Sequence, residues 1–237
     1  MSAKAVPFAK LLGGAVLLVG SAVITTASLG YFDPEELAPF VIEKLPLPNE
    51  ALWLFSLKVH VAAAAFSLPS CVALQSTWAL RRFPRIHRWL GRATGMVVLL
   101  GLAPSGFYLS LFAKGGLPGT VGFMVSAAIV VVAMVAAVTT ARSRRFAAHR
   151  RFTWHVLAQL SVAVSSRLML YVLDAVDADP EPAYLVSLWL PVVGSALAVE
   201  LAHLRLRPLS LPWRNHEAPA VSRGVEPRRA ELLAGAR

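Results

Sequence analysis

Six apolar stretches dominate this chain, and each is long enough to cross a lipid bilayer as a helix. A membrane-spanning helix needs about 20 mostly apolar residues, because the hydrocarbon core is about 30 Å thick. The stretches cover residues 9–30, 52–80, 90–112, 119–141, 152–173 and 184–204. The sequence therefore predicts an all-α, polytopic membrane protein with a transmembrane domain over residues 1–211. Residues 212–237 are rich in Pro, Arg, Glu and Ala and are predicted to form a disordered cytoplasmic tail.

Composition supports the membrane class. The chain is 57% hydrophobic and 15% charged, whereas a soluble domain carries about 25% charged residues. Its net charge of +10 comes from arginines that cluster at the ends of the apolar stretches. This clustering is typical of helices oriented by a membrane rather than of a nucleic-acid-binding surface. The single cysteine, Cys71, excludes an internal disulfide and a Cys-based zinc site, and its apolar surroundings favour a packing role.

The charges of the connections alternate along the chain. Acidic side chains gather after the first and fifth stretches: Asp33, Glu35, Glu36, Glu43, Glu50, Asp174, Asp177, Asp179 and Glu181. Arginines gather after the second and fourth stretches and in the tail: Arg81, Arg82, Arg85, Arg88, Arg92, Arg142, Arg144, Arg145, Arg150, Arg151, Arg205, Arg207 and Arg214. Basic connections stay on the cytoplasmic side, so both termini are predicted to be cytoplasmic. An alternative is that the first stretch is a cleaved signal peptide, with Thr25-Thr26-Ala27 as the cleavage region.

Two short basic segments nearly repeat each other and divide the second to fifth stretches into two related hairpins. Residues 81–89 and 144–152 both read Arg-Arg-Phe, then a spacer, then His-Arg. Short connections make sequential helices antiparallel neighbours, so these four stretches predict a four-helix core. The third and fifth stretches lie diagonally in such a bundle, which predicts that His87 and His149 face each other across its inner mouth.

Ionisable side chains within the outer half of the membrane form a first group of candidates, because such groups are costly in lipid. Lys58 and His60 of the second stretch reach a depth similar to that of Arg167 in the fifth. Asp174 follows near the outer end, and Tyr171 lies one turn from Arg167. One interpretation is an outward-facing cationic cleft for an anionic or quinone-like molecule. The alternative is a structural ion pair, with Lys58 extending its amine toward the surface.

The inner half of the membrane holds a second group, with Gln75, Glu200 and His203 close to it. Its candidates are His87, Arg88, Arg92, His149, Arg150 and His155. Three interpretations stay open: binding of lipid headgroup phosphates, a haem or metal held by paired imidazoles, or packing and capping. Because His60 is the only histidine of the outer half, a two-haem cytochrome is disfavoured and one inner haem b stays open. No metal site is assigned.

Several motifs between His60 and Arg167 together form one pattern. They are His60, Gln75, His87-Arg88-Trp89-Leu90-Gly91-Arg92, His149-Arg150-Arg151-Phe152-Thr153-Trp154-His155 and Arg167-Leu168. This pattern resembles a family of bacterial predicted membrane proteins of unknown function, although Phe152, Thr153 and His155 depart from it. The resemblance implies a multi-pass protein of the bacterial inner membrane and supplies no activity. The general layout also looks like that of membrane cytochromes b, at the level of fold alone.

No catalytic signature stands out, because the chain has no Gly-rich phosphate loop, no His-Glu-x-x-His and no Gly-x-Ser-x-Gly. The sequence leaves enzymatic activity undecided. The leading hypothesis is a membrane protein that binds a small molecule or a redox cofactor, haem or quinone, within its bundle. The alternative is a non-enzymatic accessory subunit or a transporter-like protein. Expected partners are the bilayer, anionic headgroups on the cytoplasmic side, and a membrane protein or a second copy of the chain.

Overall fold

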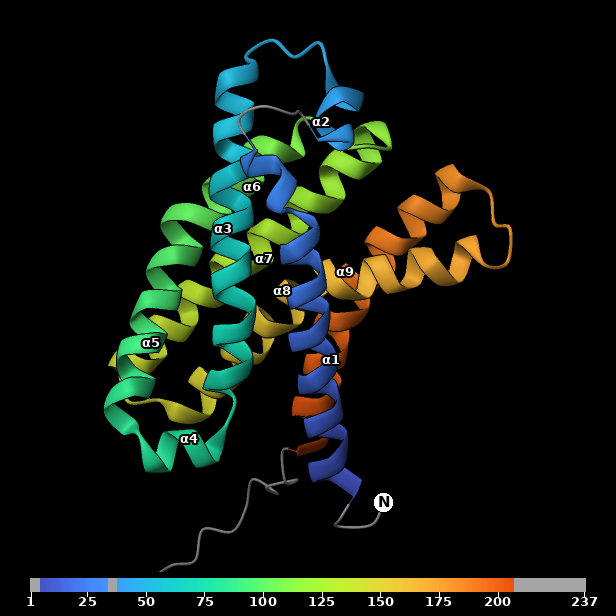
Figure 1. Ribbon diagram of the computed structural model, residues 1–237. Helices are drawn as coiled ribbons and strands as arrows, with labels where there is room; N and C mark the ends of the chain where they lie inside the picture. Colours follow the sequence, from blue (N-terminus) through green and yellow to red (C-terminus); the bar gives the residue numbers. More distant parts are fainter. Residues whose placement is uncertain (1–4, 34–37, 207–237) are drawn as a thin grey trace, which may run out of the picture. The chain divides into compact units, whose positions relative to one another are not determined.

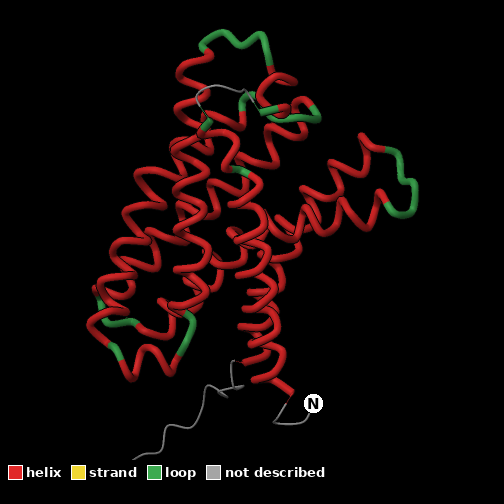
Figure 2. The backbone as a smooth tube through the Cα atoms, in the orientation of Figure 1, coloured by secondary structure: helices red, strands yellow, loops and turns green. Residues whose placement is uncertain are grey.

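The computed structural model describes residues 5–33 and 38–206 of the 237-residue chain, and the predicted tail lies outside them. The described residues are helical apart from short connections and include no strand, as Figure 2 shows. The elements, labelled in Figure 1, are α1 (Ala5–Ala27), η1 (Leu29–Phe32), α2 (Pro39–Lys44), α3 (Glu50–Leu74), α4 (Thr77–Arg82), α5 (Pro84–Val97), η2 (Val98–Leu102), α6 (Ala103–Ser110), α7 (Gly116–Arg142), α8 (Phe146–Asp174) and α9 (Pro180–Leu206).

Six helical stretches in the described residues are long and apolar enough to cross a membrane. They are Leu11–Phe32, Glu50–Leu74, Pro84–Ser110, Gly116–Arg142, Phe146–Asp174 and Pro180–Leu204. The prediction of an all-α, polytopic membrane protein is therefore confirmed. Residues up to Leu204 belong to one compact unit.

The third span is one continuous helix that contains a wide turn. Its elements α5, η2 and α6 run without a break, and η2 is a π-helical turn in which the Ala103 N–H bonds to the Val98 carbonyl oxygen. Pro104 follows and has no N–H to donate, so a regular α-helical ladder cannot pass through it. A Cβ built on Gly101, within this turn, would lie 3.5 Å from the Ala63 side chain. The turn therefore packs closely against α3.

Four helical stretches build the core of the bundle. The largest cluster of buried side chains comes from α3, η2, α7 and α8: Ala63, Leu68, Cys71, Val98, Leu102, Val130, Ala133, Met134, Val156, Leu157, Leu160 and Val164. Within it, Val98 is 0% exposed and Val156 is 1% exposed. The predicted four-helix core of two hairpins is thus present, and Cys71 lies inside it among apolar side chains.

The first helix lies against this core and approaches α8 closely. Leu17 and Ile24 of α1 pack on the core cluster. A Cβ built on Gly20 would lie only 2.5 Å from the Val164 Cγ1 atom, so no side chain fits there without a shift. Small residues at such crossings let helix backbones approach in lipid, where packing rather than hydrophobicity drives association.

The last helix, α9, is joined to the bundle by a buried amide. Gln159 of α8 is 3% exposed. Its side chain accepts a hydrogen bond from Ser126 Oγ at 2.9 Å and donates to the Val192 carbonyl oxygen at 2.9 Å and to Ser195 Oγ at 3.2 Å. Trp189 Nε1 also donates to the Pro118 carbonyl oxygen, at 3.2 Å. Polar side chains thus link α9 to both α7 and α8.

The two ends of the bundle carry opposite charge and are named here by that charge. The acidic end holds the connections 38–50 and 174–180, and the basic end holds the connections 75–84 and 143–145. At the acidic end the short helix α2 is tied to the end of α6, because Lys44 Nζ donates to the Phe112 carbonyl oxygen at 2.9 Å.

At the basic end the helices differ from the apolar stretches drawn from the sequence. The stretch 52–80 is not one helix: α3 ends at Leu74, and a separate helix α4 begins after Ser76. Ser76 Oγ caps α4 by accepting from the Ala79 N–H at 3.2 Å, a local bond that favours a new helix start. The helices of the third and fifth spans also begin earlier than residues 90 and 152, within the arginine-rich segments.

Candidate functional site

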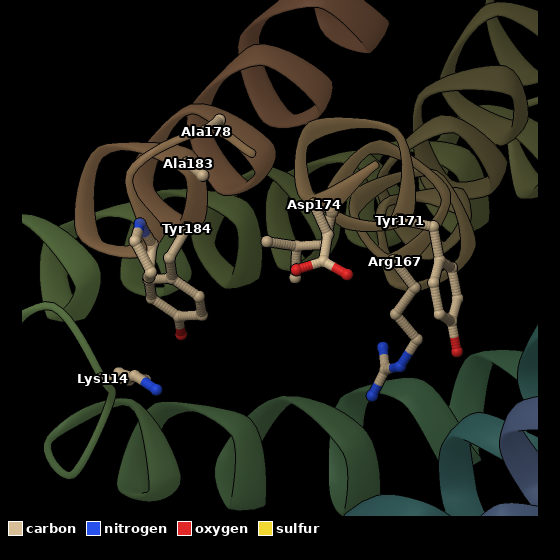
Figure 3. Close-up of a pocket in the computed structure, with 9 residues that line it drawn as sticks. Lys114, Arg167, Tyr171, Asp174, Ala178, Ala183 and Tyr184 are labelled. Carbon is tan, nitrogen blue, oxygen red and sulfur yellow. The ribbon is translucent and has the colours of Figure 1, made fainter. Parts of the chain in front are cut away.

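A cavity of about 430 Å³ opens at the acidic end of the bundle. Its walls come from the end of α8, the start of α9 and the α6–α7 connection: Lys114, Arg167, Leu170, Tyr171, Asp174, Ala178, Pro180, Ala183 and Tyr184. Figure 3 shows Lys114 and Tyr184 on one side, Arg167 and Tyr171 on the other, and Asp174 between them. A smaller hollow of about 280 Å³ shares Lys114, Pro180 and Tyr184 with it.

The helix α8 sets the depth of the charged groups in this cavity. Asp174 is the last residue of α8, at the rim of the membrane-spanning stretch. Arg167 lies seven residues earlier, on nearly the same helix face and about 10 Å deeper. Its Nη1 atom donates to the Ala163 carbonyl oxygen at 2.8 Å, which holds the side chain along its own helix. Tyr184 of α9 lines the same cavity.

A glycine turn places Lys114 at the cavity. Gly115 and Gly116 have φ values of +82° and +61°, a left-handed conformation that glycine adopts without strain. A Cβ on Gly115 would come within 2.9 Å of Leu185, so α9 packs directly on this turn. Lys114 Nζ lies 3.8 Å from Glu43 Oε1, with the two side chains 66% and 62% exposed. Such an exposed pair is weak, so the Lys114 ammonium can still bind an anion.

The candidates predicted for the outer half of the membrane separate into two places. Arg167 and Asp174 line the cavity together with Tyr171, whereas Lys58 and His60 do not line it. His60 instead points at α6, where its Nδ1 atom lies 3.3 Å from Ser105 Oγ. A Cβ on Gly106 would lie 3.1 Å from the His60 Cε1 atom. The imidazole is therefore packed against helix backbone, and this environment does not fit an axial ligand of haem.

Sequence reasoning missed Lys114 and Tyr184. Lys114 lies in a connection whose glycines predict a turn but do not indicate where its side chain points. Tyr184 is the first aromatic residue of the last apolar stretch, a position usually taken as an interfacial anchor. Both reach the cavity because α9 returns alongside α8 and packs on the α6–α7 turn.

At the basic end, the two matching histidines, His87 and His149, are both half-buried. His149 Nδ1 donates to the Ala137 carbonyl oxygen at 2.8 Å, which leaves Nε2 as an acceptor. Gln75 is used differently: its Nε2 donates to the Thr153 carbonyl oxygen at 3.4 Å and ties α3 to α8.

A charged cluster joins α8 to α9 near the basic end. Arg151 donates from two nitrogen atoms to the Glu200 carboxylate, with Nε lying 2.9 Å from Oε1. His155 Nε2 lies 2.5 Å from the same Oε1 atom. His155, predicted as a member of the histidine layer, is thus paired with Glu200. Arg88, Arg92 and Arg150 are exposed.

The described residues offer no group of three or more His, Cys, Asp or Glu side chains that could hold a metal ion. The residues that line the two cavities at the acidic end include no histidine. The larger cavity instead offers two cations, one carboxylate and two tyrosine hydroxyls, which suits recognition of an anion.

No curated protein matches the chain, and no solved structure matches it. A family model does match, over residues 57–203, which is more than half of the sequence and includes the cavity residues of α8 and α9. The resemblance to predicted membrane proteins of unknown function is thereby confirmed. The chain belongs to the family described as Predicted membrane protein (DUF2306).

Proposed function

We propose that this protein binds a small anionic molecule with an aromatic or apolar body in the cavity at the acidic end. The observation that carries the proposal is the position of Arg167. This residue is a cation within a membrane-spanning helix, and its side chain reaches the cavity. An ionisable group at such depth is costly and usually functional. In the described part of the chain, the hydrogen bond to the Ala163 carbonyl leaves its remaining donors available. A guanidinium presents these in a fork that matches a carboxylate or a phosphate.

The other walls define the rest of the ligand. Lys114 and Arg167 supply two positive charges against the single carboxylate of Asp174, so the cavity carries a net charge of about +1. Tyr171 and Tyr184 add hydroxyl groups and ring faces, and Leu170 adds an apolar wall. A cavity of about 430 Å³ lies in the range of ordinary small-molecule sites. An aromatic carboxylate fits this combination, and a quinone fits it in part, through carbonyl oxygens that accept from Arg167.

Thermal unfolding of the detergent-purified protein tests this function with three probes: benzoate, inorganic phosphate and decylubiquinone. Benzoate at ten times its Kd is expected to stabilise the wild type by about 1.4 kcal/mol, and Arg167→Gln should abolish this gain. Arg142→Gln, an exposed arginine at the other end of the bundle, is the matched control and should retain it. If decylubiquinone is the only probe that stabilises the protein, the ligand would be a quinone rather than an anion. No response to any probe would contradict binding in this cavity.

A b-type haem at the basic end is a second candidate, and the hydrogen bond that the His149 ring makes favours it. A ligating histidine commonly donates its other ring nitrogen to a carbonyl, as His149 Nδ1 does to Ala137. His87 and His149 would be the two ligands. Spectra of oxidised and dithionite-reduced protein test this: a Soret band that shifts on reduction and disappears in His149→Ala supports haem, and a flat visible spectrum contradicts it.

We also propose that the protein lies in a bacterial inner membrane with both termini and the basic end in the cytoplasm. The support is the excess of arginine in the connections 75–84 and 143–145, which is typical of cytoplasmic loops. The same arginines are proposed to meet anionic lipid headgroups. A membrane-impermeant maleimide should label Asp179→Cys but not Arg145→Cys on intact cells. The reverse labelling would invert the topology.

A transporter-like or accessory role is the alternative to simple binding. A transporter would use the same cavity and would need Arg167 and Asp174 for flux across reconstituted vesicles. An accessory subunit would instead lose assembly with its partner when the arginine connections are changed.

A further inference from the structure

The two basic connections nearly repeat each other in sequence, yet only the first folds into an extra helix. Residues 77–92, here called the elbow, consist of α4 and the first part of α5, with a bend at Phe83. The corresponding segment of the second hairpin passes from α7 to α8 through Ser143, Arg144 and Arg145 alone. The elbow therefore presents a surface that the second connection does not.

This surface combines exposed aromatic rings with positive charge that no acidic side chain of the described residues pairs. Trp78 and Trp89 are 70% and 68% exposed, and the Trp78 ring lies edge-on to Phe83 at 6.0 Å between centroids. Five arginines stand beside these rings, and no acidic residue lies between 77 and 92. The five, all exposed, are Arg81, Arg82, Arg85, Arg88 and Arg92. Tryptophan with arginine is the combination that prefers the headgroup region of a bilayer.

The apolar face of the elbow continues into the lipid-facing side of the same helix. At about 100° per residue, Ile86, Trp89 and Met96 fall within an arc of about 80° on one side of α5. Leu100 follows Met96 by about one turn, within η2. Met96 and Leu100 are 62% and 74% exposed within the apolar part of the span, where no other described residue covers them and lipid can. Trp89 and Ile86 extend this side of the helix toward the basic end, so the bilayer that covers Leu100 also reaches the elbow.

Helix length indicates the depth at which the start of α5 lies in the bilayer. The span Pro84–Ser110 has 27 residues and is about 40 Å long, against about 30 Å for the hydrocarbon core. In an untilted helix, about seven residues therefore lie in the headgroup region. Arg85 and Arg88 place those residues at the start of α5, next to the phosphates. Arg92 begins just deeper, and its guanidinium lies over the Trp89 ring at 5.4 Å. Trp89 and the arginines of α5 thus meet the interface at about the same level.

We propose that the elbow is a binding surface for anionic phospholipid, with Trp78 and Trp89 at the level where the headgroups meet the acyl chains and the arginines on the phosphates. Charge complementarity selects this occupant over a zwitterionic lipid. The inference rests on the proposed membrane placement of the basic end and is independent of ligand binding in the cavity, so each can fail without the other.

Tryptophan quenching in vesicles tests the proposal. The full chain is reconstituted in phosphatidylcholine that contains a minor fraction of phosphatidylglycerol, with bromine atoms on one lipid or on the other at equal bromine content. Brominated phosphatidylglycerol should quench tryptophan more strongly than brominated phosphatidylcholine. The joint change Trp78→Phe and Trp89→Phe, at two exposed rings, should remove this difference.

The arginines are tested by a matched pair of triple variants. Arg85→Gln with Arg88→Gln and Arg92→Gln should lose most of the preference for phosphatidylglycerol. Arg142→Gln with Arg144→Gln and Arg145→Gln removes the same charge from the second connection and should keep most of it. Equal quenching by the two lipids in the wild type would overturn the proposal and leave this surface to a protein partner. A preference that survives the tryptophan changes would overturn it as well, and this arm needs no arginine variant to fold.

Discussion

Arg167 and Asp174 lie seven residues apart on α8 and line the same cavity, yet no ion pair joins them in the described part of the chain. Their separation along the helix, about 10 Å, is too great for direct contact without a large bend of the arginine side chain. The two charges therefore remain separate anchor points at different depths. This arrangement suits a ligand whose anionic group reaches Arg167 while a neutral or donating group remains near Asp174.

Replacing Asp174 should strengthen binding of an anion. Asp174→Asn removes the one negative charge among the cavity residues, and relief of this repulsion at a partly solvated site amounts to about 0.3–1 kcal/mol. Benzoate affinity should rise by roughly twofold to fivefold. Asp177→Asn changes an exposed carboxylate that does not line the cavity and serves as the control. Weaker binding in Asp174→Asn would mean that this carboxylate contacts the ligand directly.

Replacing Glu200 should weaken the attachment of α9. Glu200→Gln leaves Arg151 and His155 without their shared carboxylate, and for this partly exposed cluster we expect a loss of about 1–2 kcal/mol in unfolding free energy. Glu43→Gln, which breaks the exposed pair with Lys114, should cost at most about 0.5 kcal/mol. Thermal unfolding in detergent measures both. Equal losses would show that the cluster adds no more than an ordinary surface pair.

The buried amide of Gln159 should matter more than that of Gln75. Gln159→Leu removes hydrogen bonds to Ser126, Val192 and Ser195 and should destabilise the protein by about 1–2 kcal/mol. Gln75→Leu removes one long contact, at 3.4 Å, and should cost clearly less. Unfolding curves of the two variants, recorded side by side, provide the comparison. A larger loss in Gln75→Leu would contradict the assignment of Gln159 as the link between α7, α8 and α9.

The crossing of α1 and α8 should tolerate no side chain at its centre. Gly20→Leu must displace Val164, whose Cγ1 would lie 2.5 Å from the new Cβ, and should destabilise the protein by about 1–3 kcal/mol. Gly13→Leu, with no atom within 4 Å of its Cβ, is the matched control on the same helix. Similar stability of the two variants would show that α1 does not hold this position.

The helices and their core were predictable because bilayer thickness leaves few choices for an apolar stretch of about 20 residues. Ala63, Val98, Ala133 and Val156 needed only to lie on four neighbouring helical stretches to form the core. The break after Leu74 was not predictable from hydropathy, since Trp78, Ala79 and Leu80 are as apolar as the helix before them. The hydroxyl of Ser76, which caps the new helix, decided it.

The sequence predicted some of the residues that line the cavity. Arg167 and Asp174 share a helix face by their spacing alone, so the sequence placed them together. Lys58 and His60 matched Arg167 in depth, but depth does not say which side of a helix a residue occupies. Glu200 and His155 stand 45 residues apart on different helices, and their contact depends on how α9 packs against α8. Pairings of this kind come from tertiary packing and have no local pattern in the chain.

Labelling of a cysteine at Ala178, with and without benzoate, tests the cavity most directly. Ala178 is half-buried in the cavity wall, and the native Cys71 is buried in the core, so a maleimide should report on the new thiol. Benzoate should slow labelling of Ala178→Cys severalfold, and adding Arg167→Gln should remove this protection. If benzoate leaves the labelling rate of Ala178→Cys unchanged in protein that retains Arg167, the result would contradict anion binding at this site.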